Sequence, residues 1–86
     1  RWQRQVDRFG DVRKWARIRA RYRLGQLVRG TVDKVYAGGE YGAIVDDWVA
    51  VVEWADVEPV VGQVGDYRIV AVLDTTRRIL LEPLQR

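Results

Sequence analysis

From Leu27 onward the chain consists of short runs rich in β-branched and aromatic residues, separated by glycine, proline and acidic residues, a pattern typical of strands joined by turns. The predicted strands are Leu27–Tyr36, Tyr41–Asp46, Trp48–Trp54, Asp66–Leu73 and Arg78–Glu82. After the third strand, Pro59, Gly62 and Gly65 indicate a loop, with one helical turn near Ala55–Glu58. A chain of 86 residues can bury only one core, so the pattern predicts a mostly β fold, a five-stranded Greek-key barrel.

The positions of the glycines favour a closed barrel. Gly30 and Gly42 fall inside predicted strands, where glycine weakens a sheet unless the strand bends sharply or another backbone approaches closely. The Gly38–Gly39 pair can supply the positive φ that a tight turn between two strands requires. Tyr36 and Tyr41 are therefore expected on either side of a turn at the mouth of the barrel.

Positive charge is concentrated at the N-terminus. Residues 1–24 contain nine basic and two acidic residues, a net charge of +7, whereas residues 25–86 contain six basic and ten acidic residues, a net charge of −4. This division suggests a basic helical segment, 1–24, followed by a barrel, 25–86. Basic arms commonly contact nucleic acid or anionic surfaces. The alternative is a helix that docks on the acidic barrel.

The basic segment has the periodicity of an amphipathic helix. Gly10 can end a first helix after Phe9 and Asp11 can cap the next, so one or two helices are predicted, with two favoured. At about 100° per residue, one side of the second helix carries apolar side chains and the other basic ones. The apolar residues are Val12, Trp15, Ile18 and Tyr22, and the basic ones are Arg13, Lys14, Arg17 and Arg21. The basic side can bind the phosphates of nucleic acid. It is equally compatible with a face that only contacts water, with binding to anionic lipid, or with docking on a protein partner.

Composition argues against catalysis and against bound cofactors. The sequence has no histidine, serine or cysteine, which excludes Ser-His-Asp and Cys-His arrangements and imidazole or thiolate zinc sites. The remaining carboxylates are typical of solvated surface, so no metal, cofactor or small-molecule substrate is expected. No apolar run approaches the roughly 20 residues of a membrane span. The absence of cysteine fits a reducing compartment, and we expect a cytoplasmic location.

Five short motifs follow one another in an order that is more specific than any of them alone. They are Trp15–Ile18, then Gly25–Val32 with the pattern G-x-x-V-x-G-x-V, Tyr41–Asp46 similar to F-G-A-F-V-D, Val64–Tyr67 similar to V-G-D-x-V, and Asp74–Leu81 with the pattern D-x-x-x-R-I-x-L. Over about Trp15–Leu84 the chain therefore resembles the RNA-binding domain named after ribosomal protein S-one. The resemblance implies an OB-fold barrel that binds single-stranded RNA across its face.

The resemblance also implies where RNA would bind. Tyr41 stands at the first aromatic position, Asp74 at the acidic position and Arg78 at the basic position of the family's site. Ile44 replaces the second aromatic residue, and Glu53 replaces a histidine on the third strand. Further candidates beside these positions are the aromatic residues Tyr36 and Trp54 and the basic residues Arg77, Lys34, Arg68, Arg13, Arg17 and Arg21.

The predicted function is a non-catalytic, single-stranded RNA-binding module, part of a longer translation or RNA-metabolism protein. Its expected mechanism is stacking of bases on Tyr41 with phosphate contacts from Arg77 and Arg78. Asp74 is expected to orient Arg78. Ile44 and Glu53 at expected contact positions support an alternative, a protein-interaction OB-fold, docking on the ribosome or another protein, whose RNA face has been lost. Association of two copies through the apolar side of the helix is a further option.

Overall fold

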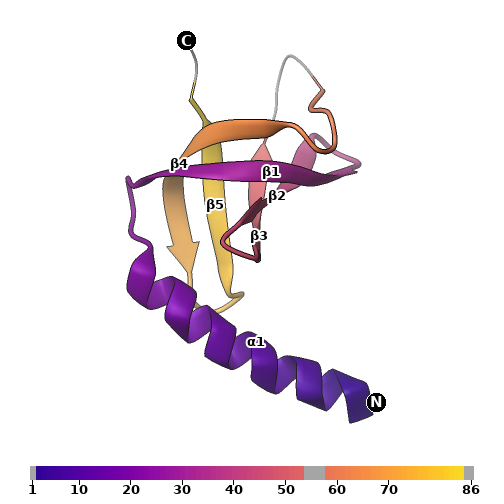
Figure 1. Ribbon diagram of the computed structural model, residues 1–86, viewed down its shortest axis with the longest axis vertical. Helices are drawn as coiled ribbons and strands as arrows, with labels where there is room; N and C mark the ends of the chain where they lie inside the picture. The colour runs from indigo at the N-terminus through magenta and orange to yellow at the C-terminus, as the bar shows by residue number, and fades with distance from the viewer. Residues whose placement is uncertain (1, 54–57, 85–86) are drawn as a thin grey trace.

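The computed structural model describes residues 2–53 and 58–84, with side chains from Val12 onward. The elements within these residues are α1 Trp2–Arg21, β1 Leu27–Tyr36, β2 Glu40–Val45, β3 Trp48–Glu53, β4 Val64–Leu73 and β5 Arg78–Pro83 (Figure 1). Each predicted strand is confirmed, with bounds that differ by at most two residues. The predicted helical turn near Ala55–Glu58 lies, except for Glu58, outside the described residues.

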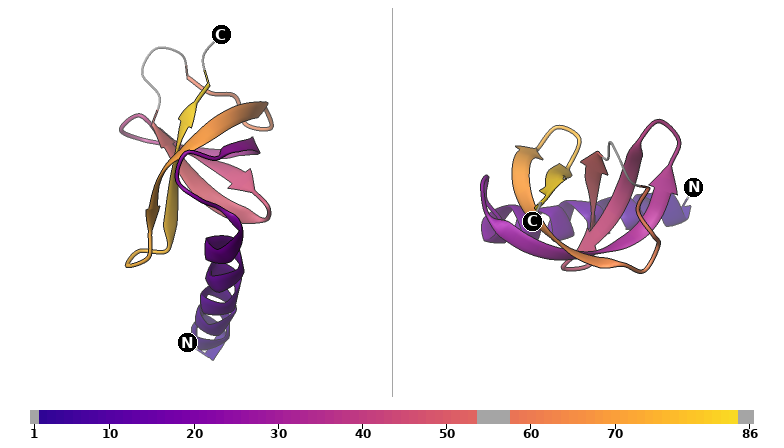
Figure 2. Two further views of the ribbon diagram at one scale, coloured as in Figure 1. Left: turned by 90° about the vertical axis from the view of Figure 1, so that its left-hand side faces the viewer. Right: turned by 90° about the horizontal axis from the view of Figure 1, so that it is seen from above.

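The strands close into a barrel in the order β1-β2-β3-β5-β4, seen end-on in the right-hand view of Figure 2. β3 and β5 run parallel and pair only at Val51↔Leu80 and Val52↔Leu81, while the other neighbouring strands are antiparallel. A closed five-stranded barrel with this crossover is an OB-like Greek-key barrel. The predicted fold class is therefore confirmed.

The two ten-residue strands β1 and β4 curve around the barrel and each pairs with two neighbours. Both carry a bulge, in β1 between Val32 and Lys34 and in β4 between Ile69 and Ala71, and bulges increase the twist that closure needs. Gly30 lies where a Cβ would come within 3.2 Å of a Val45 methyl group. The Ile44 carbonyl oxygen would lie 3.3 Å from the same Cβ, so a close backbone approach, one of the two reasons expected for a glycine inside a strand, is present here.

The turn between β1 and β2 uses its glycines as predicted. Gly38 and Gly39 have φ values of 91° and 86°, which only glycine adopts without strain. Gly42 lies on the outer face of β2, where a Cβ would be 3.0 Å from a Val49 methyl group and 3.3 Å from the Tyr36 hydroxyl. The missing side chain therefore leaves room for Tyr36 to lie across the outside of the sheet.

The N-terminal segment forms a single helix, one of the two predicted arrangements, and the break favoured at Gly10–Asp11 does not occur. Gly10 and Asp11 lie inside the 20-residue α1. A glycine in a helix interior costs about 1 kcal/mol relative to alanine, which weakens a helix without ending it. The helix ends instead at Arg21, shortly before Gly25, whose φ is 85°. Within residues 2–53 and 58–84, no helix has the length and apolar character needed to cross a membrane.

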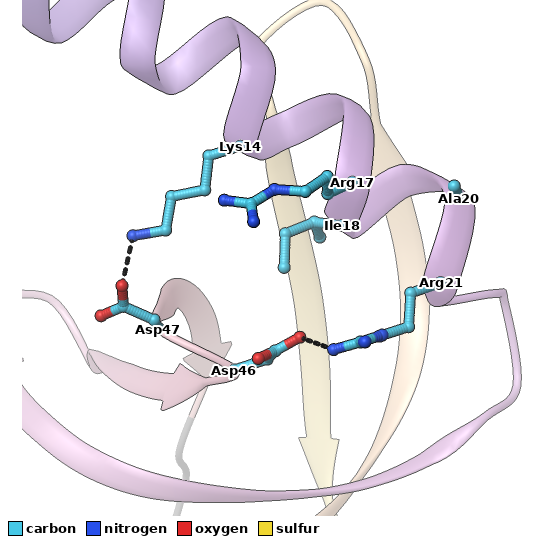
Figure 3. A pocket seen from close by; sticks show the side chains of 7 residues that line it. All are labelled: Lys14, Arg17, Ile18, Ala20, Arg21, Asp46 and Asp47. Carbon is cyan, nitrogen blue, oxygen red and sulfur yellow. Dashed lines mark hydrogen bonds and ion pairs between the residues drawn. The ribbon is translucent and has the colours of Figure 1, made fainter.

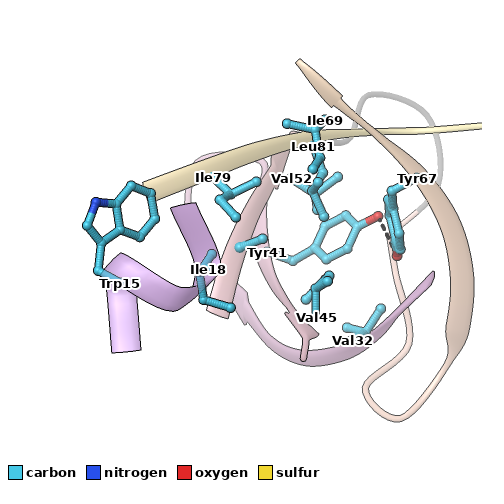
Figure 4. Close-up of a cluster of buried hydrophobic side chains, with 12 residues drawn as sticks. Trp15, Ile18, Val32, Tyr41, Val45, Val52, Tyr67, Ile69, Ile79 and Leu81 are labelled. Carbon is cyan, nitrogen blue, oxygen red and sulfur yellow. Dashed lines mark hydrogen bonds between the residues drawn. The ribbon is translucent and has the colours of Figure 1, made fainter. Parts of the chain in front are cut away.

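Helix α1 lies across one end of the barrel, and its C-terminal half is part of the core (Figures 1 and 4). Trp15 and Ile18 are buried together with inward-facing residues of the strands, and Tyr22 packs against the same cluster. The strand residues of this core are Val32, Tyr41, Ala43, Val45, Ala50, Val52, Tyr67, Ile69, Ile79 and Leu81. The alternative in which the helix docks on the acidic barrel is therefore the arrangement observed.

Candidate functional site

Ion pairs fasten α1 to the turn between β2 and β3. Lys14 Nζ lies 2.7 Å from an Asp47 carboxylate oxygen, and Arg21 Nη1 lies 2.5 Å from an Asp46 oxygen, which also accepts a hydrogen bond from the Tyr22 hydroxyl at 3.1 Å. Both pairs line a surface cavity of about 600 Å³. Figure 3 shows the two pairs with the Arg17 side chain between them. The barrel thus neutralises part of the basic side of the helix. Arg13 and Arg17 are exposed to solvent.

The β2–β3 turn is shaped to present its two carboxylates. Asp46 and Asp47 have φ values of 51° and 62°, the left-handed conformation that aspartate tolerates better than most residues. Consecutive left-handed residues form the tight turn that suits a two-residue hairpin. Both side chains therefore reach the helix from one short connection.

The Arg21 guanidinium and the Tyr22 hydroxyl hold the pKa of Asp46 below its ordinary value of 3.8. A lowered folded-state pKa adds stability above the unfolded value, and that stability is lost as pH falls through the folded value. We expect docking of α1, followed by tryptophan fluorescence, to weaken below about pH 4. In Asp46→Asn, docking of α1 should be weaker at neutral pH, and it should change less between neutral and acidic pH than in the unaltered protein.

The matched control is Asp33→Asn, which removes an exposed carboxylate of β1 that takes part in none of the described ion pairs with the helix. It should retain the acid transition of the unaltered protein. A transition of the same size in Asp46→Asn would show that this carboxylate does not hold the helix.

Asp74 also binds the helix, and the prediction that it orients Arg78 is wrong. Its carboxylate accepts a hydrogen bond from the Trp15 indole N–H at 3.1 Å and pairs with Arg19 Nε at 3.1 Å. A buried indole needs an acceptor, and Asp74 at the start of the β4–β5 turn is within reach. Of the described ion pairs, none joins Asp74 to Arg78.

Tyr41 is a core residue, so the prediction of a solvent-facing stacking platform is wrong. Its side chain is only 4% exposed, and its hydroxyl donates a hydrogen bond to the Tyr67 hydroxyl at 3.3 Å (Figure 4). Burial, reinforced by this bond, raises the pKa of Tyr41. The reason is strand register, because Tyr41 faces Val52 across the β2–β3 ladder and both point inward.

Tyr36 is the predicted aromatic residue that does reach the surface. It is 39% exposed, and Lys34 Nζ lies 5.7 Å from the centre of its ring. Trp54, the other aromatic candidate, lies outside the described residues. Arg68, on β4, is 3.8 Å from a Glu82 oxygen, an exposed pair of little energetic weight.

A groove brings the two arginines of the β4–β5 turn together with the helix. This hairpin groove has a volume of about 360 Å³ and is lined by Lys14, Asp47, Trp48, Val49, Thr76, Arg77 and Arg78. Arg77 and Arg78 are exposed, and Arg77 has a left-handed φ of 53° that helps form the turn. The predicted pair Arg77 and Arg78 thus lies beside Lys14, a helix residue far away in sequence.

Apolar side chains form the floor of the hairpin groove. Val49 is 43% exposed, and the half-buried Trp48 ring packs against Trp15 with centroids 5.5 Å apart. The Trp48 N–H is buried without a hydrogen-bond partner among the described residues, so packing alone holds the ring. The sequence did not indicate Val49 and Thr76 as lining residues, since only the fold brings β3 beside the β4–β5 turn.

The hairpin groove can hold a phosphate beside a base. Its lining provides three cations and one hydroxyl group above an apolar floor, the cations being Lys14, Arg77 and Arg78 and the hydroxyl that of Thr76. Guanidinium groups bind phosphate oxygens as forks, and an ammonium group binds them as a point charge. Among the described lining residues Asp47 is the one carboxylate, and it is paired with Lys14. No family model matches the chain, and no curated protein matches it.

Proposed function

We propose that the protein is a non-catalytic module that binds single-stranded RNA in the hairpin groove. The observation that carries this proposal is the convergence of Lys14, Arg77 and Arg78 beside exposed apolar surface. Single-stranded nucleic acid is held by such a combination, because its backbone is anionic and its bases have apolar faces. The resemblance to S-one-type domains supports the same ligand, since Arg78 matches the family's basic position.

The binding mechanism differs from the one that the motif alone implies. Buried Tyr41 supports the barrel, and a base packs on Val49 and the accessible part of Trp48 instead. Arg77 and Arg78 take the neighbouring phosphates as forks. The exposed Arg13 and Arg17 add a sequence-independent attraction that salt weakens.

The outer face of the barrel offers a second contact at the C-terminal end of β1. Tyr36 and Lys34 place an exposed aromatic ring and an ammonium group near the β1–β2 turn. An OB-fold binds oligonucleotides through its second and third strands and its first and last hairpin loops. We therefore assign Tyr36 a second stacking position, in addition to the base contact on Val49 and Trp48. The parent is then a cytoplasmic protein of translation or RNA metabolism.

The test is a titration of the isotope-labelled protein with single-stranded poly-pyrimidine RNA at about 50 and about 200 mM salt. We expect chemical-shift changes at Trp48, Val49 and Thr76–Arg78, and a marked loss of affinity at the higher salt. Changes confined to α1 would assign binding to the helix alone. No binding at low salt would refute the RNA-binding function.

A further inference from the structure

A second groove lies on the outer face of the barrel, toward the opposite ends of β3 and β5 from the hairpin groove. This acid-rimmed groove has a volume of about 580 Å³ and is lined by Glu40, Val51, Glu53, Val70, Leu80, Leu81 and Glu82. Three of these side chains are carboxylates and four are aliphatic. Among the described residues, no basic side chain lines it, so the charge of this lining is opposite to that of the hairpin groove.

The floor of the acid-rimmed groove is apolar surface left uncovered by the described residues. Val51 and Leu80 are half-buried and face each other across the β3–β5 pair, and Val70 of β4 is 43% exposed. The pairing of β3 with β5 ends at Val52↔Leu81, so the two strands no longer pair where the carboxylates begin. An aliphatic side chain placed here would remove several such residues from water at once.

Two of the carboxylates oppose each other in a way that costs stability. Glu40 and Glu53 are direct partners in the β2–β3 ladder, and like charges in this position repel. Among the described ion pairs, neither glutamate has a basic partner, while Glu82 has only Arg68 at 3.8 Å. A cation bound between Glu40 and Glu53 would turn this repulsion into attraction.

We propose that the acid-rimmed groove docks a basic, amphipathic segment of a partner protein, with an arginine between Glu40 and Glu53 and a neighbouring aliphatic side chain on Val51 and Leu80. Arginine fits because its planar fork can donate to two carboxylates. RNA does not fit, because three carboxylates repel phosphate. The inference concerns a surface separate from the hairpin groove and does not depend on RNA binding.

The test uses an acetylated, amidated peptide of sequence Gly-Arg-Leu-Arg-Leu-Gly, with a second peptide in which glutamine replaces arginine. We expect saturable chemical-shift changes at Glu40, Val51, Glu53 and Leu80 with the arginine peptide only. Glu40→Gln/Glu53→Gln should bind it at least about tenfold more weakly, as loss of close charge pairs at an interface does. Asp33→Asn, which removes an exposed charge outside the groove, should change the affinity less than about twofold.

Two further measurements separate docking from folding. Glu53→Gln relieves the cross-strand repulsion, so its Tm should rise by about 2–4 °C while its peptide affinity falls. Val70→Thr changes an exposed position, so the fold should be kept. It should weaken binding of the arginine peptide, because it makes the floor of the groove less apolar. The proposal would be overturned if the two peptides bound equally or if the chemical-shift changes lay outside the groove. It would also be overturned if Glu40→Gln/Glu53→Gln kept the affinity of the unaltered protein, or if RNA shifted the signals of the same residues.

Discussion

Trp15→Ala is expected to lower the free energy of unfolding by about 3–5 kcal/mol, the usual cost of removing a buried tryptophan. The side chain is 7% exposed, packs against Trp48 and donates its N–H to Asp74. The substitution would therefore leave a cavity between helix and barrel and remove one partner of the Asp74 carboxylate. Because a small domain has only about 5–15 kcal/mol of stability, much of it would be lost.

Urea denaturation followed by far-ultraviolet and near-ultraviolet circular dichroism would measure this loss. Val12→Ala is the matched control, because Val12 lies on the same helix but is 43% exposed, and its cost should stay below about 1 kcal/mol. If both variants lost the same small amount, α1 would not be docked on the barrel in solution.

Local sequence patterns predicted the barrel because its strands are defined by local signals. Leu27–Tyr36 was predicted with the observed bounds, since Gly25 precedes it and Gly38–Gly39 follows it. Turn glycines and β-branched runs depend on backbone conformation, which a short stretch of sequence specifies. A Greek-key barrel was expected from the five strands and the loop after the third, whereas the strand order, with β5 between β3 and β4, comes from the structure.

The direction of side chains within a strand was harder to predict. Strand β2 has apolar or small residues on both faces, so its alternation does not show which face is inside. Pairing with β3 puts Tyr41 inward and leaves Gly42 outside beneath Tyr36. The aromatic residue of the motif thus became a core residue, while the exposed one came from the end of β1.

Contacts between the helix and the barrel depend on residues far apart in the chain. Lys14 and Asp47 are separated by 33 positions and Trp15 and Asp74 by 59, so no local pattern indicates either pair. The overall charges of +7 and −4 suggested docking only as an alternative. The hairpin groove was missed for the same reason, because its cations come from two ends of the chain.

Arg77→Ala/Arg78→Ala is expected to weaken binding of poly-pyrimidine RNA by at least about tenfold at low salt, since each guanidinium group takes a phosphate. The slope of log K against log salt should become shallower by about 1.4, because each phosphate contact to a single strand contributes about 0.7. Both side chains are exposed, so stability should change by less than about 0.5 kcal/mol.

Arg29→Ala/Arg68→Ala is the matched control, because it removes the same charge from exposed positions outside the hairpin groove. Its binding should fall far less, and its salt dependence should stay near that of the unaltered protein. Equal losses in the two double variants would mean that RNA responds only to net charge. A loss confined to Arg77→Ala/Arg78→Ala would instead identify the β4–β5 turn as the place where the backbone of the RNA is held, because only position distinguishes the two variants.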